Sequence, residues 1–549
     1  MLLKRKGNLL LTVSVLLTFF SCQKNEITTP ETFYYKTINI NGQEGKFTIK
    51  NAAVNTEIAL EFSAPIDKVS ASRALSLKGP EGNVPLNVNY SNNDSTLLIT
   101  TQNALKYMSK YTFSVSEDLL TKNQTQLNSN ITATILTQID STDKFQRISD
   151  EELLTKIQSQ TFKYFWDFGH PVSGLSRERD TSGDLVTSGG SGFGIMAIPV
   201  GIERGFISRA QGLERLQKIT DFLLTKTTTY HGVFPHWFNG STGATIPFST
   251  KDNGADLVET SYLMMGLLTA RSYFDRNTEE EKQLRASITT LWENVEWDWF
   301  TKGGENVLYW HWSPTYNWDM NLPLRGWNEG LITYILAAAS PTHSISKEVY
   351  SEGWARNGGM KNGNKFYNHI LPLGSSLGGP LFFEHYTFLG IDPRNLKDSY
   401  ADYWEQVTSH TLINHDYCVD NPKNFAGYSQ DCWGLTASDT YGGYTAHSPT
   451  NDVGVISPTA ALSSIAYTPE ESMKALHFFY YKIGDKLFKN YGFTDAFSIE
   501  IPWFASSFLA IDQGPIIGMI ENYRTGLLWK LTMKDPDIQK GLDKLDFTY

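Results

Sequence analysis

The chain has 549 residues, of which 40% are hydrophobic and 19% charged. This composition is that of a folded protein, and the length exceeds what one core accommodates, so we expect at least two domains. The formal net charge of −11 at pH 7 argues against a nucleic-acid partner, which needs a concentrated basic surface.

The first predicted element is a targeting segment, residues 1–22. A basic start at residues 4–6 precedes an apolar run over residues 9–20, and Ser21 and Cys22 follow this run. This pattern is typical of a secretory signal and is too short for a membrane-spanning helix. It resembles a bacterial lipoprotein signal, in which Cys22 is lipidated after cleavage; simple secretion is the alternative. We expect a periplasmic or outer-membrane-anchored lipoprotein of a Gram-negative bacterium, in contact with the membrane only through its lipid.

In residues 33–138, hydrophobic and polar side chains alternate in short runs that are separated by turn residues. Thr, Val and Ile are abundant in segments such as "EIALEFSAPID" (57–67) and "VPLNVNYSNNDSTLLITT" (84–101). This texture predicts a small antiparallel β-sandwich. The segment 57–67 resembles the bacterial Ig-like domains of secreted proteins, which implies a spacer or docking module without chemistry of its own.

Helical patterns dominate from residue 145 to the end of the chain. Ser149 or Asp150 can cap a helix over 150–168, whose first turn is acidic. Further helices are predicted over 208–227, 256–274, 278–298, 327–339, 397–412, 456–466, 469–485, 502–511 and 515–531. The connecting stretches 231–254, 309–330 and 424–454 are long and rich in Gly, Pro and aromatic residues, and loops of this length usually carry function. This alternation predicts an all-α (α/α)6 toroid over residues 145–549.

Several familiar motifs are absent from the sequence. The Gly-rich stretch "SGGSGFGIMAIPVG" (188–201) lacks the spacing of a dinucleotide-binding loop or of a serine hydrolase. No Cys/His cluster has zinc spacing and no P-loop is present, so these motifs indicate no zinc site, and we expect no cofactor. Cys418 and Cys432 do not make a disulfide framework, and two buried thiols are favoured over a bridge.

Carboxylates in aromatic-rich segments are the remaining candidates for chemistry. Asp256 and Glu259 open a predicted helix, and with Asp252 they share the face that carries its apolar stripe. Glu329 lies in "LPLRGWNEG", and Asp512 lies in "FLAIDQGP". Glycoside hydrolysis needs such a set: one carboxylic acid protonates the departing oxygen, and a second carboxylate attacks the sugar or activates water.

Each of these acids has a structural alternative. Asp256 and Glu259 would also suit the positive end of a helix dipole, although such acids normally face water. Glu329 would pair with Arg325 one turn earlier, and Asp512 would cap a helix before Pro515. The combination of all of them favours a catalytic site over these separate explanations.

Six segments resemble the bacterial glucoamylase-like domain, and in particular glycoside hydrolase family 144, the β-1,2-glucan-degrading enzymes. They are "QTFKYFWDFGHPVSGLSRERD", "GFGIMAIPVGIERG", "DNGADLVETSYLMMGLL", "LRGWNEG", "YGGYTAH" and "AIDQGPIIGMIENYRTGLLWKL". The resemblance covers residues 145–549. It implies an (α/α)6 toroid, no metal requirement and inverting hydrolysis of β-1,2-linked glucose chains, in some members with release of sophorose. The family's important acids fall on Asp252, Asp256, Glu259, Glu329 and Asp512.

An inverting enzyme holds its two carboxyls about 6.5–9.5 Å apart, whereas acids one turn apart on a helix are about 5–6 Å apart. A pair from different segments is therefore favoured, with Glu329 as general acid and Asp512 as base. Asp256 and Glu259 then bind sugar hydroxyls or assist catalysis through a water. In the alternative assignment, the general acid is one of the carboxyls on their helix. Residues predicted to bind substrate are Asp252, Arg325, Trp237, Trp310, Trp433, Tyr441 and His447.

Two rival classes stay open at the level of the sequence. The first is a non-catalytic glycan-binding lipoprotein that uses the same aromatic cleft. The second is a toroid-fold polysaccharide lyase, in which His447 and Arg177 would act on a uronic acid. The intact acids favour a hydrolase, whose partner is an oligo- or polysaccharide, and we expect a monomer.

Overall fold

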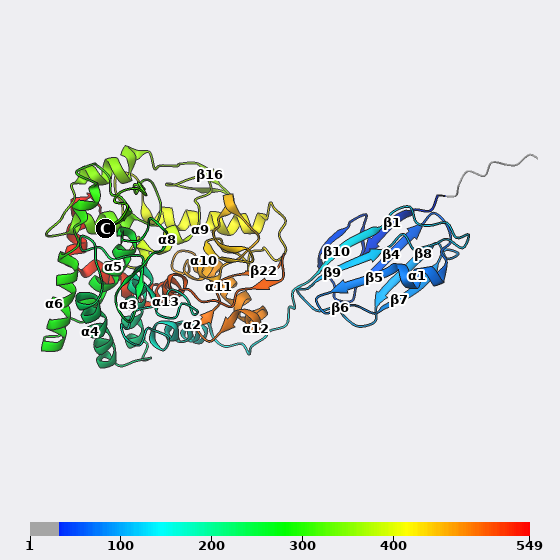
Figure 1. Ribbon diagram of the computed structural model, residues 1–549, viewed down its shortest axis with the longest axis horizontal. Helices are drawn as coiled ribbons and strands as arrows, with labels where there is room; N and C mark the ends of the chain where they lie inside the picture. Colours follow the sequence, from blue (N-terminus) through cyan, green and yellow to red (C-terminus); the bar gives the residue numbers. More distant parts are fainter. Residues whose placement is uncertain (1–31) are drawn as a thin grey trace, which may run out of the picture. The chain divides into compact units, whose positions relative to one another are not determined.

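The computed structural model describes residues 32–549, which form two units, an N-terminal β unit and a C-terminal helical unit. The predicted signal segment and its lipidation site Cys22 lie outside the described residues. Figure 1 shows the strands of the first unit and the helices of the second.

Two five-stranded sheets make up the N-terminal unit. One has the order β2-β1-β4-β8-β7 and the other β3-β10-β9-β5-β6. The strands are β1 (Tyr35–Ile40), β2 (Gln43–Glu44), β3 (Thr48–Ala52), β4 (Glu57–Phe62), β5 (Leu75–Gly79), β6 (Gly82–Asn83), β7 (Leu86–Ser91), β8 (Thr96–Thr101), β9 (Lys110–Val115) and β10 (Ile131–Thr137), with helix α1 (Lys68–Ala74) between β4 and β5. In β4 and β9 every second side chain is buried, which confirms the predicted β-sandwich.

The C-terminal unit is mainly helical, as predicted. Its helices are α2 (Asp150–Trp166), α3 (Ser188–Glu203), α4 (Arg209–Thr225), α5 (Leu257–Tyr273), α6 (Glu279–Glu293), α7 (Leu331–Ala339), α8 (Phe382–His385), α9 (Tyr403–Asp420), α10 (Pro458–Leu462), α11 (Pro469–His477), α12 (Gly484–Leu487), α13 (Ala510–Thr525), α14 (Leu527–Lys534) and α15 (Pro536–Lys544). Within residues 32–549, each helix is too short or too polar to cross a lipid bilayer.

Short strands decorate the loops between these helices. They are β11 (Leu185–Thr187), β12 (Trp237–Asn239), β13 (Thr245–Ile246), β14 (Ala255–Asp256), β15 (His311–Trp312), β16 (Lys365–Phe366), β17 (His369–Ile370), β18 (Ala437–Thr440), β19 (Gly443–Ala446), β20 (Phe488–Lys489), β21 (Gly492–Phe493), β22 (Phe497–Ser498) and β23 (Trp503–Phe504). Two of these pairings matter for the site: β11 with β12, and β14 with β15.

Two sequence predictions of secondary structure are wrong. Residues 502–511 were expected to be helical, but they contain β23 and a loop that leads into α13. The Gly-rich stretch 188–201, for which no helix was predicted, forms the buried helix α3. Its glycines let it approach α5 closely: a Cβ at Gly192 would meet the backbone oxygen of Tyr262 at 2.1 Å, and one at Gly266 would meet that of Gly192 at 2.3 Å.

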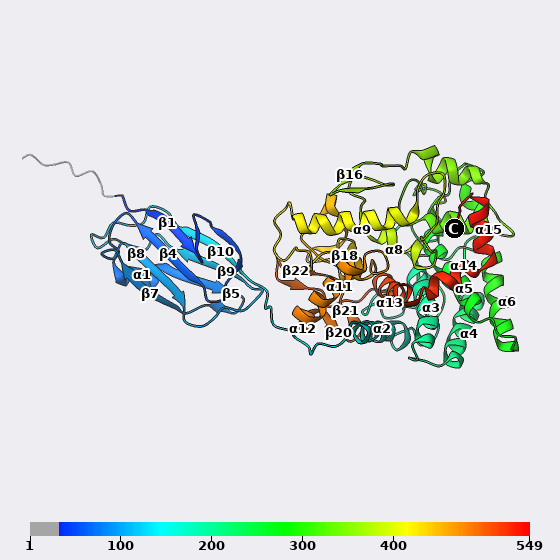
Figure 2. The same ribbon diagram turned by 180° about the vertical axis from the view of Figure 1, so that it is seen from behind.

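Helices α3, α5 and α13 lie at the centre of the helical unit, while α4 and α6 lie at its edge (Figures 1 and 2). Helix α3 packs against both α5 and α13, and α5 packs against α7. The stripe of α5 is buried along its whole length, from Leu257 to Ala270. Asp256, Glu329 and Asp512 lie at or close to the first residues of α5, α7 and α13, and the segments before these helices therefore position the candidate acids beside the buried core.

Candidate active site

The start of α5 carries two buried carboxylates. Asp256 is the N-cap residue of the helix, and its Oδ1 accepts a hydrogen bond from the backbone N–H of Glu259 at 3.0 Å. The backbone of Asp256 also belongs to β14, opposite His311 in β15. Asp256 is completely buried and Glu259 is 5% exposed. Asp256 and Glu259 therefore combine the two roles that the sequence left open: they stand at the start of the helix, and they lie on its buried face.

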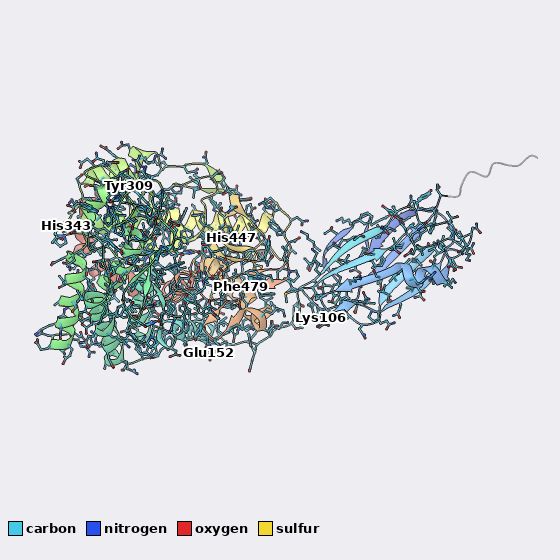
Figure 3. All side chains as sticks on the ribbon, in the orientation of Figure 1. Lys106, Glu152, Tyr309, His343, His447 and Phe479 are labelled. Carbon is cyan, nitrogen blue, oxygen red and sulfur yellow. The ribbon has the colours of Figure 1, made fainter. Side chains whose placement is uncertain are left out.

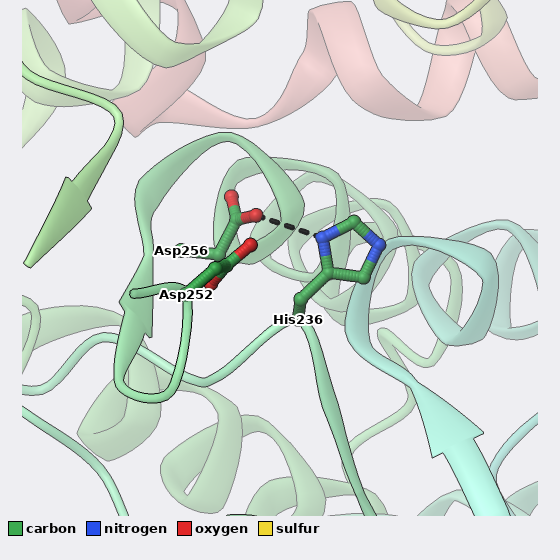
Figure 4. Close-up of side chains that lie close together, drawn as sticks. All are labelled: His236, Asp252 and Asp256. Carbon is green, nitrogen blue, oxygen red and sulfur yellow. Dashed lines mark hydrogen bonds and ion pairs between the residues drawn. The ribbon is translucent and has the colours of Figure 1, made fainter. Parts of the chain in front are cut away.

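Asp252 and Asp256 are surrounded by two histidines. The Nδ1 of His236 lies 2.9 Å from an oxygen of Asp256 (Figure 4). The Nε2 of His311 lies 3.3 Å from Asp252 and 3.5 Å from Asp256. Burial disfavours the charged form of each imidazole, but the neighbouring carboxylates outweigh it and raise the pKa of both His236 and His311 to about 9.

Asp256 is held as a carboxylate by the same contacts. Burial opposes its ionisation, but hydrogen bonds from His236 and His311 outweigh burial and lower its pKa. The indole N–H of Trp310 donates a further hydrogen bond to Oδ1 of Asp256 at 2.9 Å. Asp256 is thus a fixed anion in the neutral pH range.

One nitrogen of His236 and one oxygen each of Asp252 and Asp256 lie within 4.8 Å of one another. This spacing would allow them to hold a metal ion, which requires a neutral imidazole. The neighbouring carboxylates raise the pKa of His236, so a metal ion would have to displace a proton from its imidazole. The absence of a metal stays a prediction.

Glu259 differs from Asp256 in its ionisation. Its Oε2 accepts hydrogen bonds from the backbone N–H of Gly189 at 2.9 Å and from the hydroxyl of Thr187 at 3.3 Å. Burial raises the pKa of Glu259, the imidazolium of His236 opposes that shift, and the charge of Asp256 adds to it; the pKa stays raised. A Cβ at Gly189 would lie 2.4 Å from this oxygen, so a glycine is needed here for the carboxylate to reach α3.

Glu329 lies directly before α7, at the end of a well-anchored loop. Its backbone carbonyl accepts hydrogen bonds from the hydroxyls of Tyr262 at 3.3 Å and Thr387 at 3.1 Å. Two residues earlier, the indole of Trp327 donates to buried Glu384 at 2.8 Å. Burial, together with the charges of Glu259 and Asp256, raises the pKa of Glu329 to about 7. Glu329 can therefore carry a proton in the neutral range.

A second group of carboxylates surrounds the first turn of α13. Asp512 is 2% exposed, and burial, the charge of Asp495 and a hydrogen bond with that residue raise its pKa strongly. Burial also raises the pKa of Asp495, to about 7. An oxygen of Asp495 accepts the backbone N–H of Asp439 at 2.6 Å, and Arg179 bridges Asp439 and Glu178. Asp512 and Asp495 thus share a proton, since two adjacent buried carboxylates do not both ionise.

The two carboxylate groups meet around Tyr386. The ring of Tyr386 lies 5.5 Å from that of Tyr262, which bonds to the Glu329 backbone. After burial, the charge of Asp512 is the largest cause of the raised pKa of Tyr386, and Glu259 also contributes. Glu259 and Asp512 therefore both lie close to one phenol, although 253 positions separate them in the sequence.

A cavity of about 300 Å³ opens between the two groups. Thr187, His236, Trp237 and Phe248 line it from the side of α5, and Glu178, Arg179, Tyr444, Leu509 and Ile511 line it from the side of α13. The rings of Trp237 and Phe248 lie 4.7 Å apart and form an aromatic wall. Such a mixture of aromatic surface and convergent polar groups is typical of a small-molecule site.

Several buried polar atoms of the site have no hydrogen-bond partner among the described residues. They are Oδ1 of Asp252, Oδ1 of Asp495, Oδ2 of Asp512, Nε1 of Trp237 and Nδ1 of His311. Buried polar atoms are nearly always paired in folded proteins. Trp237 lines the cavity, and the other four belong to the two carboxylate groups beside it, so a polar ligand bound here could complete their hydrogen bonding.

The structure brings together most, but not all, of the residues predicted to form the site. Asp252, Asp256, Glu259, Glu329 and Trp310 lie in one cluster, and Trp237 lines the cavity. Asp512 belongs to the second group of carboxylates, and its chain neighbour Ile511 lines the same cavity. Four residues predicted to bind substrate are placed elsewhere, each in its own surroundings.

Trp433 is fully buried in the hydrophobic core and donates to the backbone of Glu471. His447 is buried against the hydroxyl of Ser438, and burial lowers its pKa to about 3. Tyr441 is exposed and donates to the backbone of Val453, and Arg325 is also exposed. Glycine-rich surroundings suggested a ligand role for these side chains, but their loops turn them into the core or out to solvent.

Sequence reasoning missed the partners of the predicted acids. His236 precedes Trp237 directly, and His311 follows Trp310 directly, so each was adjacent to a chosen aromatic. Glu178, Asp439 and Asp495 lie in separate segments with no spacing in common. Only their hydrogen bonds and charges around Asp512 reveal them.

Replacing His236 by glutamine tests the ion cluster. The raised pKa of His236 means that its contribution to stability is fully present below about pH 6.5 and is lost as the pH rises through about 9. We expect the variant to be less stable than the native protein by about 2 kcal/mol at pH 6 and nearly equal above pH 9. Urea unfolding at both pH values measures this, and a pH-independent difference would contradict it.

Comparisons with known proteins agree with this geometry. Residues 321–536 match the family model described as "Putative glucoamylase", and residues 46–144 match the bacterial Ig-like domain. The endo-β-1,2-glucanase from Chitinophaga pinensis, solved with sophorotriose and glucose, is 54% identical with a TM-score of 0.72, over 73% of this chain and 99% of that one. The β-1,2-glucanase from Parabacteroides distasonis is 38% identical with a TM-score of 0.71, over 93% of this chain and 73% of that one.

A curated relative, the exo β-1,2-glucooligosaccharide sophorohydrolase (non-reducing end) of Parabacteroides distasonis, is 47% identical over 420 residues. These residues make up 72% of this chain, which spans 58% of that protein's length. The high identity over nearly the full length of solved relatives confirms the resemblance seen in the sequence. This chain belongs to the bacterial glucoamylase-like family of glycoside hydrolases, family 144.

Proposed function

We propose that the protein hydrolyses β-1,2-linked glucans or their oligosaccharides, by a two-carboxylate mechanism with inversion. The observation that carries this proposal is one aromatic-walled cavity lined both by His236, the partner of Asp256, and by Leu509 and Ile511, which flank Asp512 in the chain. Glu329 and the Asp512–Asp495 pair, whose pKa values are raised, are the candidate acid and base. Incubation with linear β-1,2-glucan, sophoro-oligosaccharides, starch and other glucans, followed by product sizing, tests it. Release of sophorose alone would indicate cleavage from a chain end, and a ladder of products would indicate internal cleavage. No release of sugar from β-1,2-glucan would refute the proposal.

In this mechanism Glu329 is the general acid. Its protonated form near pH 7 can donate a proton to the oxygen of the departing sugar. The Asp512–Asp495 pair holds one proton and one negative charge. When the shared proton lies on Asp495, Asp512 is ionised and can take a proton from the attacking water. Asp256 and Asp252, held in place by His236 and His311, accept hydrogen bonds from sugar hydroxyls. The indole N–H of Trp237 has no acceptor within residues 32–549 and can donate to the sugar.

The pKa of Glu329 predicts the alkaline limb of the pH profile. Because the acid must be protonated, kcat/KM should fall about tenfold per pH unit above about pH 7. Initial rates on a sophoro-oligosaccharide between pH 4 and 10 measure this. The same limb in the Glu329→Gln variant's residual activity would assign it to another group.

We also propose that the helical unit is an (α/α)6 toroid. Six inner elements support it, namely α3, α5, α7, α8, α10 and α13, which alternate along the chain with outer elements α2, α4, α6, the turn Val349–Trp354, α9 and α11. Neighbouring inner helices pack together, as α13 does with α3 and with α10. In this arrangement residues 145–549 form one catalytic domain, and the loops entering the inner helices carry the site.

The lyase alternative has little support in the geometry. His447 is buried against Ser438, and Arg177 donates to the backbone carbonyls of Gly183 and Phe168. Neither side chain lines the cavity. Against glycan binding without catalysis, the chain has carboxyl groups at all the positions that match the family's important acids.

For localisation, we propose that lipidation of Cys22 anchors the protein to a membrane facing the periplasm or the cell surface. The support is the signal-like segment 1–22. The native protein should partition into the detergent phase after phase separation, and the Cys22→Ala variant into the aqueous phase. Equal partitioning of the two would contradict the anchor.

A further inference from the structure

A second hollow in the helical unit, of about 720 Å³, lies outside the catalytic cavity. It is lined by the short helix Trp297–Thr301 after α6, by Trp318 in the loop before α7, and by His343 after α7. None of its lining residues is shared with the cavity beside Asp256. Figure 3 shows His343 well apart from His447 in the same unit.

The most exposed aromatic of this hollow is Trp299, at 41%. One face of its ring is covered by the imidazole of His231, with ring centroids 3.8 Å apart and planes 14° apart. His231 is itself held by Glu296 at 2.8 Å. The indole is therefore fixed in place, and the exposed part of its ring has no function in the core.

Trp318 extends this aromatic surface. Its ring lies 6.5 Å from that of Trp299, inclined by 33°, and it is supported edge-on by Phe300 and Tyr309 at 5.8 Å each. Two indoles at this spacing and inclination present a concave pair of flat faces. Rigid, partly exposed Trp rings in a hollow are more typical of a binding surface than of an ordinary protein exterior.

The rim of the hollow carries charges of both signs. Asp298 pairs with Nδ1 of His343 at 3.0 Å, and Lys302 donates to Asn321 at 2.7 Å. With Glu296, the lining has two carboxylates against one lysine and is not basic, so the surface suits a neutral ligand with many hydroxyl groups. An anionic chain would need a basic surface, and an apolar partner would need a drier rim.

An aromatic path connects this surface to the catalytic cluster. Trp312 follows His311 directly in β15, and its ring meets that of His231 edge-on at 5.2 Å and that of Trp299 at 6.4 Å. These contacts join Trp299 to β15, the strand that carries His311.

We propose that Trp299 and Trp318 form a second carbohydrate site, which holds a neutral β-glucan chain outside the catalytic cavity. This inference rests on the proposed function, because it takes the same polymer as ligand. Its effect is avidity: a chain bound at the surface site raises the local concentration of glucan at the catalytic site. Short oligosaccharides, which reach only the cavity, gain nothing from it.

The test uses the full chain with Glu329→Gln, which removes turnover, and measures affinity for long β-1,2-glucan in a native gel that contains the polymer. We expect Trp299→Ala to raise the Kd about tenfold, and Trp299→Ala with Trp318→Ala to raise it further. Tyr523→Ala, which removes another exposed aromatic (43% exposed), is the matched control and should leave the Kd unchanged.

A second measurement separates this inference from the proposed function. In the active protein, Trp299→Ala should raise KM for the polymer and leave kcat/KM for a sophoro-oligosaccharide within about twofold, which also shows that the variant is folded. Unchanged polymer affinity in both Trp variants would overturn the second site while hydrolysis stands. Absence of hydrolysis by the native protein, with polymer retention that still depends on Trp299, would refute the proposed function and keep the second site.

Discussion

Replacing Glu329 by glutamine is expected to lower kcat on β-1,2-glucan by about 10³-fold, because the amide cannot donate the proton that the departing oxygen needs. Burial and two neighbouring carboxylates raise the pKa of Glu329, which is the property required of an acid. The backbone of the loop is held through its carbonyl and through Trp327, not through the carboxyl group, so the variant should fold normally.

An aryl glycoside with an acidic leaving group separates the acid role from other roles. Such a leaving group departs without protonation, so the Glu329→Gln variant should recover most of its rate on this substrate. Glu348→Gln, an exposed acid of the same unit, is the control and should behave as the native protein. Equal losses on the glucan and on the aryl glycoside would show that Glu329 is not the acid, and would favour the reversed assignment with the acid on α5.

Replacing Asp512 by asparagine is expected to lower kcat by at least about 10³-fold on both substrates, because activation of the water is needed whatever the leaving group. The Oδ2 atom of Asp512 has no partner among the described residues and is free to act. Rate measurements on the glucan and the aryl glycoside, with circular dichroism to check folding, test this. Near-native rates on the aryl glycoside would remove Asp512 from the role of base.

Asp495→Asn provides a graded comparison for the same pair. Removing Asp495 takes away a like charge and a hydrogen bond that both raise the pKa of Asp512. The pKa of Asp512 should then fall, so the base is ionised at lower pH and the acidic limb of kcat/KM moves to lower pH. A limb that stays in place would show that the two carboxyls do not titrate as a pair.

Local sequence patterns were enough to predict that the first unit is built from strands and the second mainly from helices. Alternation of side chains in 57–62 and 110–115 predicts strands, and the capping box at Ser149 and Glu152 marks the start of α2. The same holds for Asp256 and Glu259, whose alignment with an apolar stripe predicts burial. Each of these features depends on residues that are only a few positions apart in the sequence, and hydrophobic periodicity reports contacts over this short range.

Tertiary structure decided which acids act together and which aromatic residues face the ligand. Asp512 depends on Asp495, Asp439 and Glu178, and these four residues come from segments that share no spacing; only the packing of α13 against α3 brings them beside Glu259. Trp237 and Trp433 both lie in Gly-rich loops, yet one lines the cavity and the other is buried. The direction of a loop side chain and the pKa of a carboxyl are set by contacts distant in sequence, and no local pattern encodes them.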